Sequence, residues 1–443
     1  MTENKSLAIS LLLGRELQKD LSNIFEKEFP FGQFPKDSAS RDRLYNRETT
    51  LLTMINSSAL SDRSLKNSVL IYNKIHERNI ARIEHAESEL RNALASNPSK
   101  RIRKTLDIQK SKRKPISTKT GGYSQARTRL SSEYVKQVYR KSAESASPSS
   151  KEYFYGRQVF ITDGTYVQLQ DSAAIAEKFN KSLKDGYPRG LISAVIEQGS
   201  GLVTDFTMDS DKKSELELFG TMINNLPTGS LLLADALYDC FAIYGLLIER
   251  NVDLIVPDKR GRKYHVLKTI AEGDEIVKIT IASNKSKIYN KFNIKTESLK
   301  LRRIEIASPN DNKTIVLFTT ILDESIGKMA MYLKYFTRWD IEISIREIKQ
   351  IMNLNILRGQ SPDMALKELT AGLIAYNYIR TIITRTVAKT DFPPEVDLIY
   401  ELYKNNKIGY VDKLGREYSK HSPGRYGGAR ERDNQEHHSS ASK

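Results

Sequence analysis

The sequence predicts an α/β protein in which a mixed sheet is flanked by helices, with a helical region ahead of the sheet. Residues 1 to about 98 contain many charges and few β-branched runs, which is typical of helices. From Tyr153 onward, strand-like and helix-like segments alternate, a pattern typical of a sheet covered by helices. Residues 258–322 then hold several strand-like segments without helices between them, and this pattern predicts a β-rich insertion.

We expect residues 1–150 to form a basic, helical, DNA-binding domain that ends in a linker. Leu51, Ile55 and Ala59 recur at helical spacing. The segment from Lys100 to Pro115 carries eight Lys or Arg residues against one Asp. Such a run is either a solvated linker or an arm that contacts phosphates. The candidate phosphate contacts in this segment are Lys100, Arg101, Arg103, Lys104, Lys112, Arg113 and Lys114.

The composition indicates a nucleic-acid partner. The formal net charge is +16 and the pI is about 9.5, and so large a basic excess usually accompanies a polyanionic partner. No apolar stretch approaches the roughly 18 residues of a membrane-spanning helix, so we expect no membrane association. The single cysteine, Cys240, excludes an internal disulfide and a cysteine zinc cluster. We therefore expect a cytoplasmic protein, nucleoid-associated in a prokaryote.

Residues 151–257 predict the order three strands, helix, strand, helix, strand. "RQVFITDGTYVQLQ" alternates like a strand, and "GLISAVIEQGSGLVTDFTMD" predicts two strands joined by a Gly-Ser-Gly hairpin. Within the insertion at 258–322, the strand-like segments are "EIVKITIAS", "FNIKTE", "LRRIEIAS" and "KTIVLFTTIL". Helices are expected again over 323–390. Residues 391–443 form a C-terminal segment, and its tail from about 411 is expected to be disordered.

Two acidic residues follow strand-like runs and are candidates for metal-dependent chemistry. Two divalent cations can activate the attacking oxygen and stabilise the leaving oxygen in phosphoryl transfer, and Mg²⁺ prefers carboxylate ligands. Asp163 ends or interrupts the strand predicted at 157–162, although Asp163-Gly164 also fits a hairpin turn. Asp235 follows the buried run "LLLA", where α/β sheets place their ligands, although it also fits the N-cap of the next helix.

The segment "YFTRWDIEISIREIKQIMNL" is predicted to be a helix with a charged stripe about 60° wide. The stripe consists of Tyr335, Arg338, Glu342 and Lys349, and Trp339 and Arg346 flank it. A solvated face with i,i+4 ion pairs has similar spacing. However, Tyr and Trp are unusual on such a face, and the cations outnumber the acids. The stripe therefore suits phosphates on either side of a metal-bound carboxylate.

This stripe resembles the signature of a known family. The spacing Tyr335-x2-Arg338-x3-Glu342-x6-Lys349 is similar to the Tyr-Arg-Glu-Lys signature of the insertion-sequence transposases of family four. These enzymes belong to the larger class with two Asp and one Glu on an RNase H-like fold.

Three further segments resemble the same family. "TDGT" at 162–165 and "LLLADALYDCFAIYGLL" at 231–247 are similar to its first and second catalytic segments, although Leu237 stands where a small or aromatic residue is usual. Residues 359–380 resemble its C-terminal helices, and a β insertion before the Glu is also a family feature. The resemblance covers roughly residues 155–385.

The resemblance implies the chemistry of each position. Asp163, Asp235 and Glu342 are expected to be catalytic and to hold two Mg²⁺ or Mn²⁺ ions. Among the remaining stripe residues, Arg338 and Lys349 are expected to grip phosphates together with Tyr335 and the flanking Arg346. Trp339 is expected to stack on a displaced base.

The expected function is that of a bacterial insertion-sequence transposase. It binds terminal inverted repeats and catalyses DNA cleavage and strand transfer on double-stranded DNA. No GxxxxGK[ST] loop occurs, in agreement with the family's lack of a nucleotide cofactor. Because moving an element requires two ends held together, we expect a homodimer on paired ends. Two alternatives remain: another RNase H-like metal-dependent nuclease, or a DNA-binding protein whose catalytic site has decayed.

Overall fold

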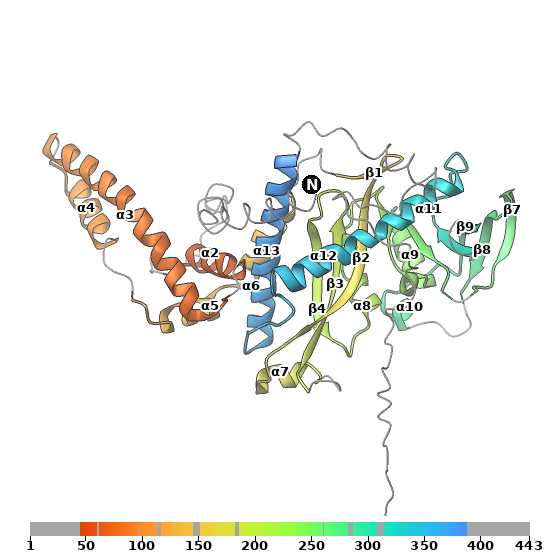
Figure 1. The fold of residues 1–443 in the computed structure, drawn as a ribbon, viewed down its shortest axis with the longest axis horizontal. Helices are drawn as coiled ribbons and strands as arrows, with labels where there is room; N and C mark the ends of the chain where they lie inside the picture. Colours follow the sequence, from red (N-terminus) through yellow and green to blue (C-terminus); the bar gives the residue numbers. More distant parts are fainter. Residues whose placement is uncertain are drawn as a thin grey trace, which may run out of the picture.

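A ten-stranded sheet forms the centre of the molecule (Figure 1). The computed structural model describes residues 45–387 except 60–61, 97, 113–116, 145–150, 182–185, 260, 282–286 and 308–313. The strands are β1 Tyr153–Phe154, β2 Arg157–Gln168, β3 Arg189–Glu197, β4 Val203–Ser210, β5 Leu231–Leu233, β6 Asp253–Pro257, β7 His265–Ala271, β8 Asp274–Thr280, β9 Ser298–Ala307 and β10 Thr314–Thr319. Their order in the sheet is β4-β3-β2-β5-β6-β10-β9-β8-β7, with β1 paired to β2.

The strand directions are those of the predicted RNase H-like core. Strands β2, β3 and β4 form an antiparallel meander, and β5 and β6 run parallel to β2. The mixed sheet flanked by helices is therefore confirmed. The insertion continues the same sheet, because β10 pairs antiparallel with β6 and leads to β9, β8 and β7.

Alternating side chains fill two cores, one on each face of the sheet. Val159 and Ile161 of β2 lie in one core, whereas Phe160 between them lies in the other. The side chains of β5, Leu231–Leu233, are fully buried, as expected for a short apolar strand in the middle of a sheet. The "LLLA" run is therefore the central buried strand that its composition predicts.

Helices cover both faces. Their bounds are α2 Arg47–Ser58, α3 Leu65–Ser96, α4 Lys100–Lys112, α5 Gly121–Arg129, α6 Ser132–Ala143, α7 Ala173–Lys178, α8 Glu215–Gly220, α9 Phe241–Glu249, α10 Lys287–Lys291, α11 Lys328–Phe336, α12 Asp340–Arg346 and α13 Pro362–Val387. Side chains of α8 and α9 share the core of Phe160. Side chains of α6, α11, α12 and α13 share the core of Ile161. In Figure 1, α11 and α12 cross in front of the sheet.

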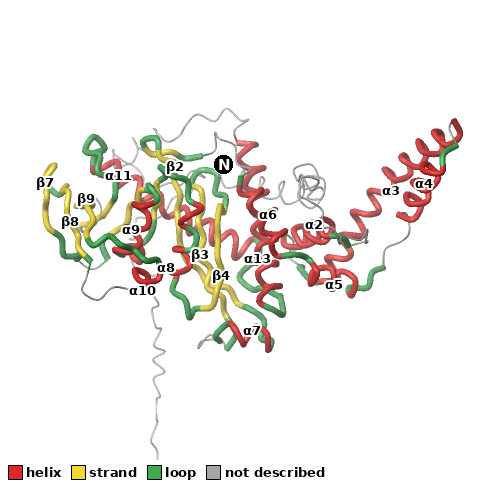
Figure 2. The backbone as a smooth tube through the Cα atoms, turned by 180° about the vertical axis from the view of Figure 1, so that it is seen from behind, coloured by secondary structure: helices red, strands yellow, loops and turns green. Residues whose placement is uncertain are grey.

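The N-terminal helices form an arm that is anchored in the catalytic half of the chain. Helices α3 and α4 pack against each other and project away from the sheet (Figures 1 and 2). At the base of the arm, α2 packs against α13, and Leu51 and Ile55 belong to the same core as Ile161. The described part of the region expected at 1–150 is thus helical, but its base shares a core with the sheet.

Two details of the predicted insertion are wrong. "FNIKTE" is not a strand, because residues 292–297 form the turn and loop between α10 and β9. Strand β7, His265–Ala271, was not predicted, since nearly all its side chains are exposed and its sequence lacks a buried face. The C-terminal segment 391–443, with the tail expected to be disordered, lies outside the described residues. No helix of the described chain is long and apolar enough to cross a membrane.

Candidate active site

Asp163 lies inside strand β2, and the alternative of an Asp-Gly hairpin is wrong. The strand continues through Asp163 and Gly164 to Gln168, and Asp163 pairs with Ala194 of β3. The backbone N–H of Gly164 donates to Asp163 Oδ1 at 2.7 Å. The acid is thus held on a strand in the middle of the sheet.

Gly164 makes room for another acidic side chain. A Cβ atom at this position would overlap the carboxylate of Glu215, which lies at the start of α8. The Tyr238 hydroxyl donates to Glu215 Oε1 at 2.8 Å and fixes that carboxylate. The glycine in "TDGT" therefore permits close packing and does not form a turn.

Asp235 occupies the position on β5 that corresponds to Asp163 on β2. The parallel pairing joins Val159 to Leu231 and Ile161 to Leu233. Each aspartate follows the last residue pair between β2 and β5 by two positions, so both lie just beyond the point where this pairing ends, although β2 itself continues to Gln168. We call this point the strand end, because β5 ends there. Asp235 also caps the short helix Ala236–Tyr238, because the N–H of Leu237 donates to its Oδ1 at 2.8 Å. Asp235 therefore caps the following helix and also lies where a metal ligand is expected.

Glu342 is carried by α12, which packs against β2. Its carboxylate is exposed and forms an ion pair with Arg338 at 3.6 Å. Its side chain approaches from the face of the sheet that also buries Ile341 and Ile161. The third candidate acid thus comes from a different element but faces the same strand end.

The carboxylates act on one another electrostatically. Burial raises the pKa of Asp163 to about 6. The hydrogen bond from Gly164 and the charge of Arg338 oppose this rise, whereas the charges of Asp235 and Glu342 add to it. In the described residues, neither Asp163 nor Asp235 forms an ion pair with a Lys or Arg side chain. A partly buried carboxylate without a cationic partner is costly, so this strand end suits a bound cation.

The donor set fits Mg²⁺ or Mn²⁺ in kind, since it consists of hard carboxylate oxygens. However, no group of three or more acidic, histidine or cysteine side chains in the described chain lies close enough to hold a metal ion as it stands. Glu342 is paired with Arg338. To bring the three carboxylates together, Glu342 must therefore leave its ion pair with Arg338 and move toward Asp163 and Asp235.

The predicted stripe does not lie on one regular helix. The segment consists of α11, a 3₁₀ turn at Thr337–Trp339, α12 and a π-helical turn at Glu347–Ile351. Regular spacing of 100° per residue is lost at both turns, so the prediction of a single narrow face is wrong. A π turn inside an α-helix often marks a functional site, and this one contains Lys349.

The stripe cations and aromatic residues occupy different environments. Arg338 is buried, its Nε has no hydrogen-bond partner within the described structure, and its guanidinium lies 5.2 Å from the Trp339 ring. Burial lowers the pKa of Lys349, whose Nζ donates to Thr165 Oγ1 at 3.1 Å. Burial raises the pKa of Tyr335. Arg346 is exposed. Lys349 therefore reaches back to the strand of Asp163.

The basic segment forms helix α4, far from the carboxylates in both views (Figures 1 and 2). Lys100, Arg101, Arg103 and Lys104 are exposed on it. Lys112 ends the helix, and its side chain is not described; Arg113 and Lys114 lie outside the described residues. The exposed cations form a surface of their own, separate from the stripe.

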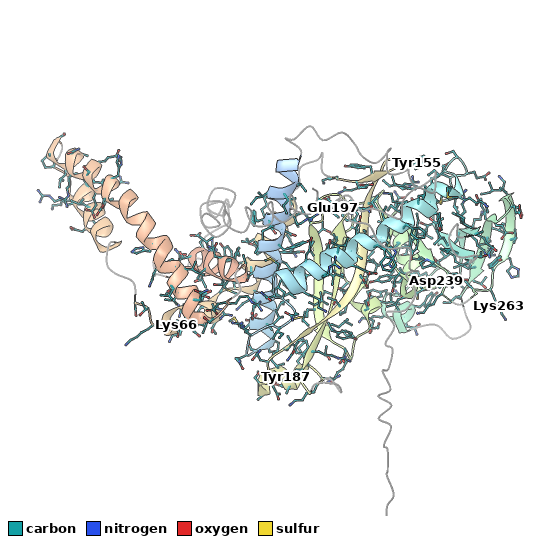
Figure 3. All side chains as sticks on the ribbon, in the orientation of Figure 1. Lys66, Tyr155, Tyr187, Glu197, Asp239 and Lys263 are labelled. Atoms are coloured by element: carbon teal, nitrogen blue, oxygen red, sulfur yellow. The ribbon has the colours of Figure 1, made fainter. Side chains whose placement is uncertain are left out.

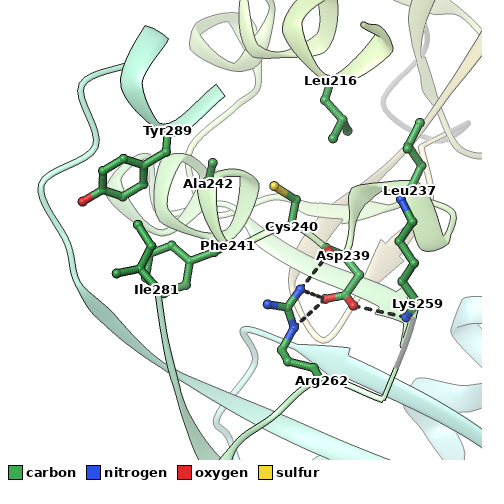
Figure 4. A pocket seen from close by; sticks show the side chains of 10 residues that line it. All are labelled: Leu216, Leu237, Asp239, Cys240, Phe241, Ala242, Lys259, Arg262, Ile281 and Tyr289. Carbon is green, nitrogen blue, oxygen red and sulfur yellow. Dashed lines mark hydrogen bonds and ion pairs between the residues drawn. The ribbon is translucent and has the colours of Figure 1, made fainter. Parts of the chain in front are cut away.

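A cavity of about 280 Å³ lies next to the strand end, between α9 and the insertion (Figure 4). It contains Asp239, an acid placed beside the insertion in Figure 3. Arg262 pairs with Asp239 at 2.6 Å, and the N–H of Lys259 donates to it at 3.1 Å. Because its charge is already compensated, Asp239 is a structural acid, unlike Asp163 and Asp235.

Sequence reasoning missed Glu215. The local sequence signals only a helix start here, through the capping box formed by Ser214 and Glu217, and Glu215 is not part of that box. Its position near Asp163 depends on how α8 crosses the sheet, and local sequence does not encode that crossing.

Comparisons with known proteins agree with this geometry. Residues 154–378 match the family model described as "Transposase DDE domain". The chain is 27% identical over 270 residues to transposase InsG for insertion sequence element IS4 of Escherichia coli (strain K12), over 58% of this chain and 59% of that protein. The match thus spans less than two thirds of the relative.

One solved structure is a more distant match. The cryo-EM structure of a piggyBac transposase synaptic complex with hairpin DNA aligns with a TM-score of 0.37 and 9% identity, over 82% of this chain and 80% of that one. The family match covers more than half of the chain and nearly all of the segments that carry the resemblance. The chain therefore belongs to the transposase DDE domain family, as its resemblance to the insertion-sequence transposases of family four predicted.

Proposed function

We propose that this protein is the DNA transposase of a bacterial insertion sequence, which cuts DNA at the element's terminal inverted repeats and joins the ends to a target. One observation carries the proposal: Asp163 and Asp235 occupy corresponding positions just beyond the point where the parallel pairing of β2 with β5 ends, and Glu342 is carried by a helix packed on β2. Such an end of an α/β sheet is where ligands bind. Family membership supports the same reaction class.

In this proposal Asp163, Asp235 and Glu342 hold two Mg²⁺ or Mn²⁺ ions. When bound, the ions activate the attacking oxygen and stabilise the leaving oxygen of a phosphodiester. In the free protein Arg338 forms an ion pair with Glu342. When DNA binds, a phosphate replaces Glu342 as the partner of Arg338. Glu342 then turns toward the two aspartates. The buried guanidinium and its unpaired Nε suit a phosphate, because Arg donates from several N–H groups at once.

The remaining cations position DNA. Lys349 lies beside the strand of Asp163 and contacts a phosphate near the cleaved bond, with Tyr335 and Arg346 alongside. Trp339 stacks on a displaced base. The exposed face of α4 contacts the double-stranded DNA of the element's end, at a distance from the bond that is cleaved. Two chains act as a homodimer on two paired ends, without a nucleotide cofactor, in the cytoplasm at the nucleoid.

The test is cleavage and strand transfer on duplexes that carry the element's end. Asp163→Asn, Asp235→Asn and Glu342→Gln should each abolish both reactions in Mg²⁺ while end binding survives, because each change removes ligand charge. Asp171→Asn is a matched control, since Asp171 is exposed just beyond β2 and pairs with Lys181. Near wild-type cleavage by any of the three variants would exclude that residue as a ligand.

The same assay separates the alternatives. An RNase H-like nuclease would cleave the end without joining it to a target. A decayed DNA-binding protein would bind the end and do neither. Joined products that depend on the three carboxylates support the transposase alone.

A further inference from the structure

We propose that Glu215 is a fourth carboxylate of this metal site, which approaches the strand end from the face opposite to Glu342. The inference rests on the proposed function. It concerns a residue outside the Asp-Asp-Glu set, and three independent features of the structure support it.

The first feature is placement between two acids. The pairing of β2 with β5 ends at Ile161 and Leu233, and Asp163 and Asp235 lie just beyond it. Helix α8 packs against β3 and β4 on the Phe160 face and brings Glu215 over Gly164, next to Asp163. The charges of Asp163 and Asp235 both act on Glu215. Acidic side chains from both faces of the sheet therefore border the same part of β2, although no three of them in the described chain lie close enough together to hold a metal ion as they stand.

The second feature is that Gly164 keeps this place open. A Cβ atom there would overlap the Glu215 carboxylate. Gly164 lies within β2, where its φ is not in the left-handed region, so no backbone conformation requires a glycine. Since glycine weakens a strand, its presence here is explained by the space that it leaves for the acid.

The third feature is the lack of a compensating cation. Within the described residues Glu215 forms no ion pair, and the Tyr238 hydroxyl is its hydrogen-bond donor at 2.8 Å. Tyr238 is fully buried and holds Oε1 in place, which leaves Oε2 over Gly164. Burial raises the pKa of Glu215 to about 7. A carboxylate fixed and partly buried beside two others, without a cation, suits a metal or a metal-bound water as its partner.

The experiment measures Mn²⁺ binding to the full chain without DNA, by the loss of the electron paramagnetic resonance signal of free Mn²⁺. Glu215→Gln should weaken binding by about tenfold or more, the range for residues that support metal ligands. Cleavage should then require more Mg²⁺ and recover as Mg²⁺ is raised. The matched control is Glu217→Gln on the same helix, because Glu217 pairs with Lys291 away from the site.

A second variant tests the inference with a change that disturbs the fold less. Tyr238→Phe keeps the buried ring and removes only the hydroxyl that holds Glu215, so it should weaken Mn²⁺ binding in the same direction by a smaller factor. Equal Mn²⁺ affinity for Glu215→Gln and Glu217→Gln would overturn the inference, provided that Asp163→Asn and Asp235→Asn weaken binding. If Asp163→Asn and Asp235→Asn also bind Mn²⁺ normally, both this inference and the metal site of the proposed function are refuted.

Discussion

Removing four exposed cations from the described side chains of α4 should separate end recognition from chemistry. Lys100, Arg101, Arg103 and Lys104 lie on a helix that projects from the molecule, and no carboxylate of the site lies near it. Changing all four to Gln keeps helix propensity, since Gln, Lys and Arg are similar helix formers. The fold should therefore survive, and only the charge of the arm should change.

The magnitude follows from counterion release. Each phosphate contact contributes about 0.9 to the log–log slope of affinity against salt, so four contacts contribute about 3.6. Between about 50 and about 200 mM salt, the wild type should lose roughly 150-fold more affinity than the variant. Fluorescence anisotropy on end and scrambled duplexes measures both slopes. If α4 reads the end, the preference for end DNA over scrambled DNA should fall as well.

A charge-matched control excludes a general effect of net charge. Its four lysines are exposed on and around α7 and in the loop before α8, and three of them are already paired with aspartates. They are Lys178, Lys181, Lys212 and Lys213. Changing them to Gln should leave the slope within about one contact of the wild type. A wild-type slope and preference in the α4 variant would show that the arm is a solvated surface and that DNA is read elsewhere.

Four further predictions follow from the site and its support. Lys349→Ala should weaken end binding and reduce the salt slope by about 0.9 without changing the metal requirement; an unchanged slope would assign Lys349 a purely structural bond to Thr165. Ile341→Ala should lower the free energy of unfolding by about 2–5 kcal/mol in urea, because its side chain is fully buried; a negligible loss would contradict the packing of α12. Chelation with EDTA should stop cleavage but spare end binding, and persistent cleavage would refute metal dependence. Light scattering with end DNA should show two chains on two ends; one chain on two ends would refute the dimer.

The central strand β5 and the position of Asp235 could be predicted from local sequence. Leu231–Leu233 forms a short, fully apolar run, and such a run is buried in the middle of a sheet. An acid directly after it has to lie at the strand end, whatever the rest of the fold. The apolar face of the Glu helix could also be predicted, because Ile341, Ile345, Ile348 and Met352 recur at helical spacing. Three of these side chains are buried, and Ile345 is partly buried against the same core.

The hairpin alternative at Asp163-Gly164 fails for a reason that is not local. Asp-Gly is a strong turn signal in isolation, yet here the pairing with β3 continues through both residues. The glycine is explained by Glu215, about 50 residues later in the sequence, whose carboxylate occupies the space beside Gly164. Only a residue brought in by the tertiary fold explains that glycine.

The helical-wheel prediction fails for a different reason. A wheel assumes 100° for every residue, but the 3₁₀ turn at Thr337–Trp339 and the π turn at Glu347–Ile351 change that angle. The result is that Arg338 becomes buried while Glu342 stays exposed. Neither turn contains a Gly or Pro, so the sequence has no local marker for the change.

The anchoring of the arm decides which experiment can locate end recognition. Truncating residues 1–115 removes Leu51 and Ile55, each fully buried and each contributing about 1.5–3 kcal/mol, out of a total stability of about 5–15 kcal/mol. It also removes Arg63, which donates to the carbonyl oxygens of Asn353 and Ile356 and pairs with Glu368. These contacts brace the segment just after Lys349. A truncated protein that loses activity has therefore lost support for its active site as well as its arm, whereas the α4 charge variant removes exposed charges of the arm and leaves that support in place.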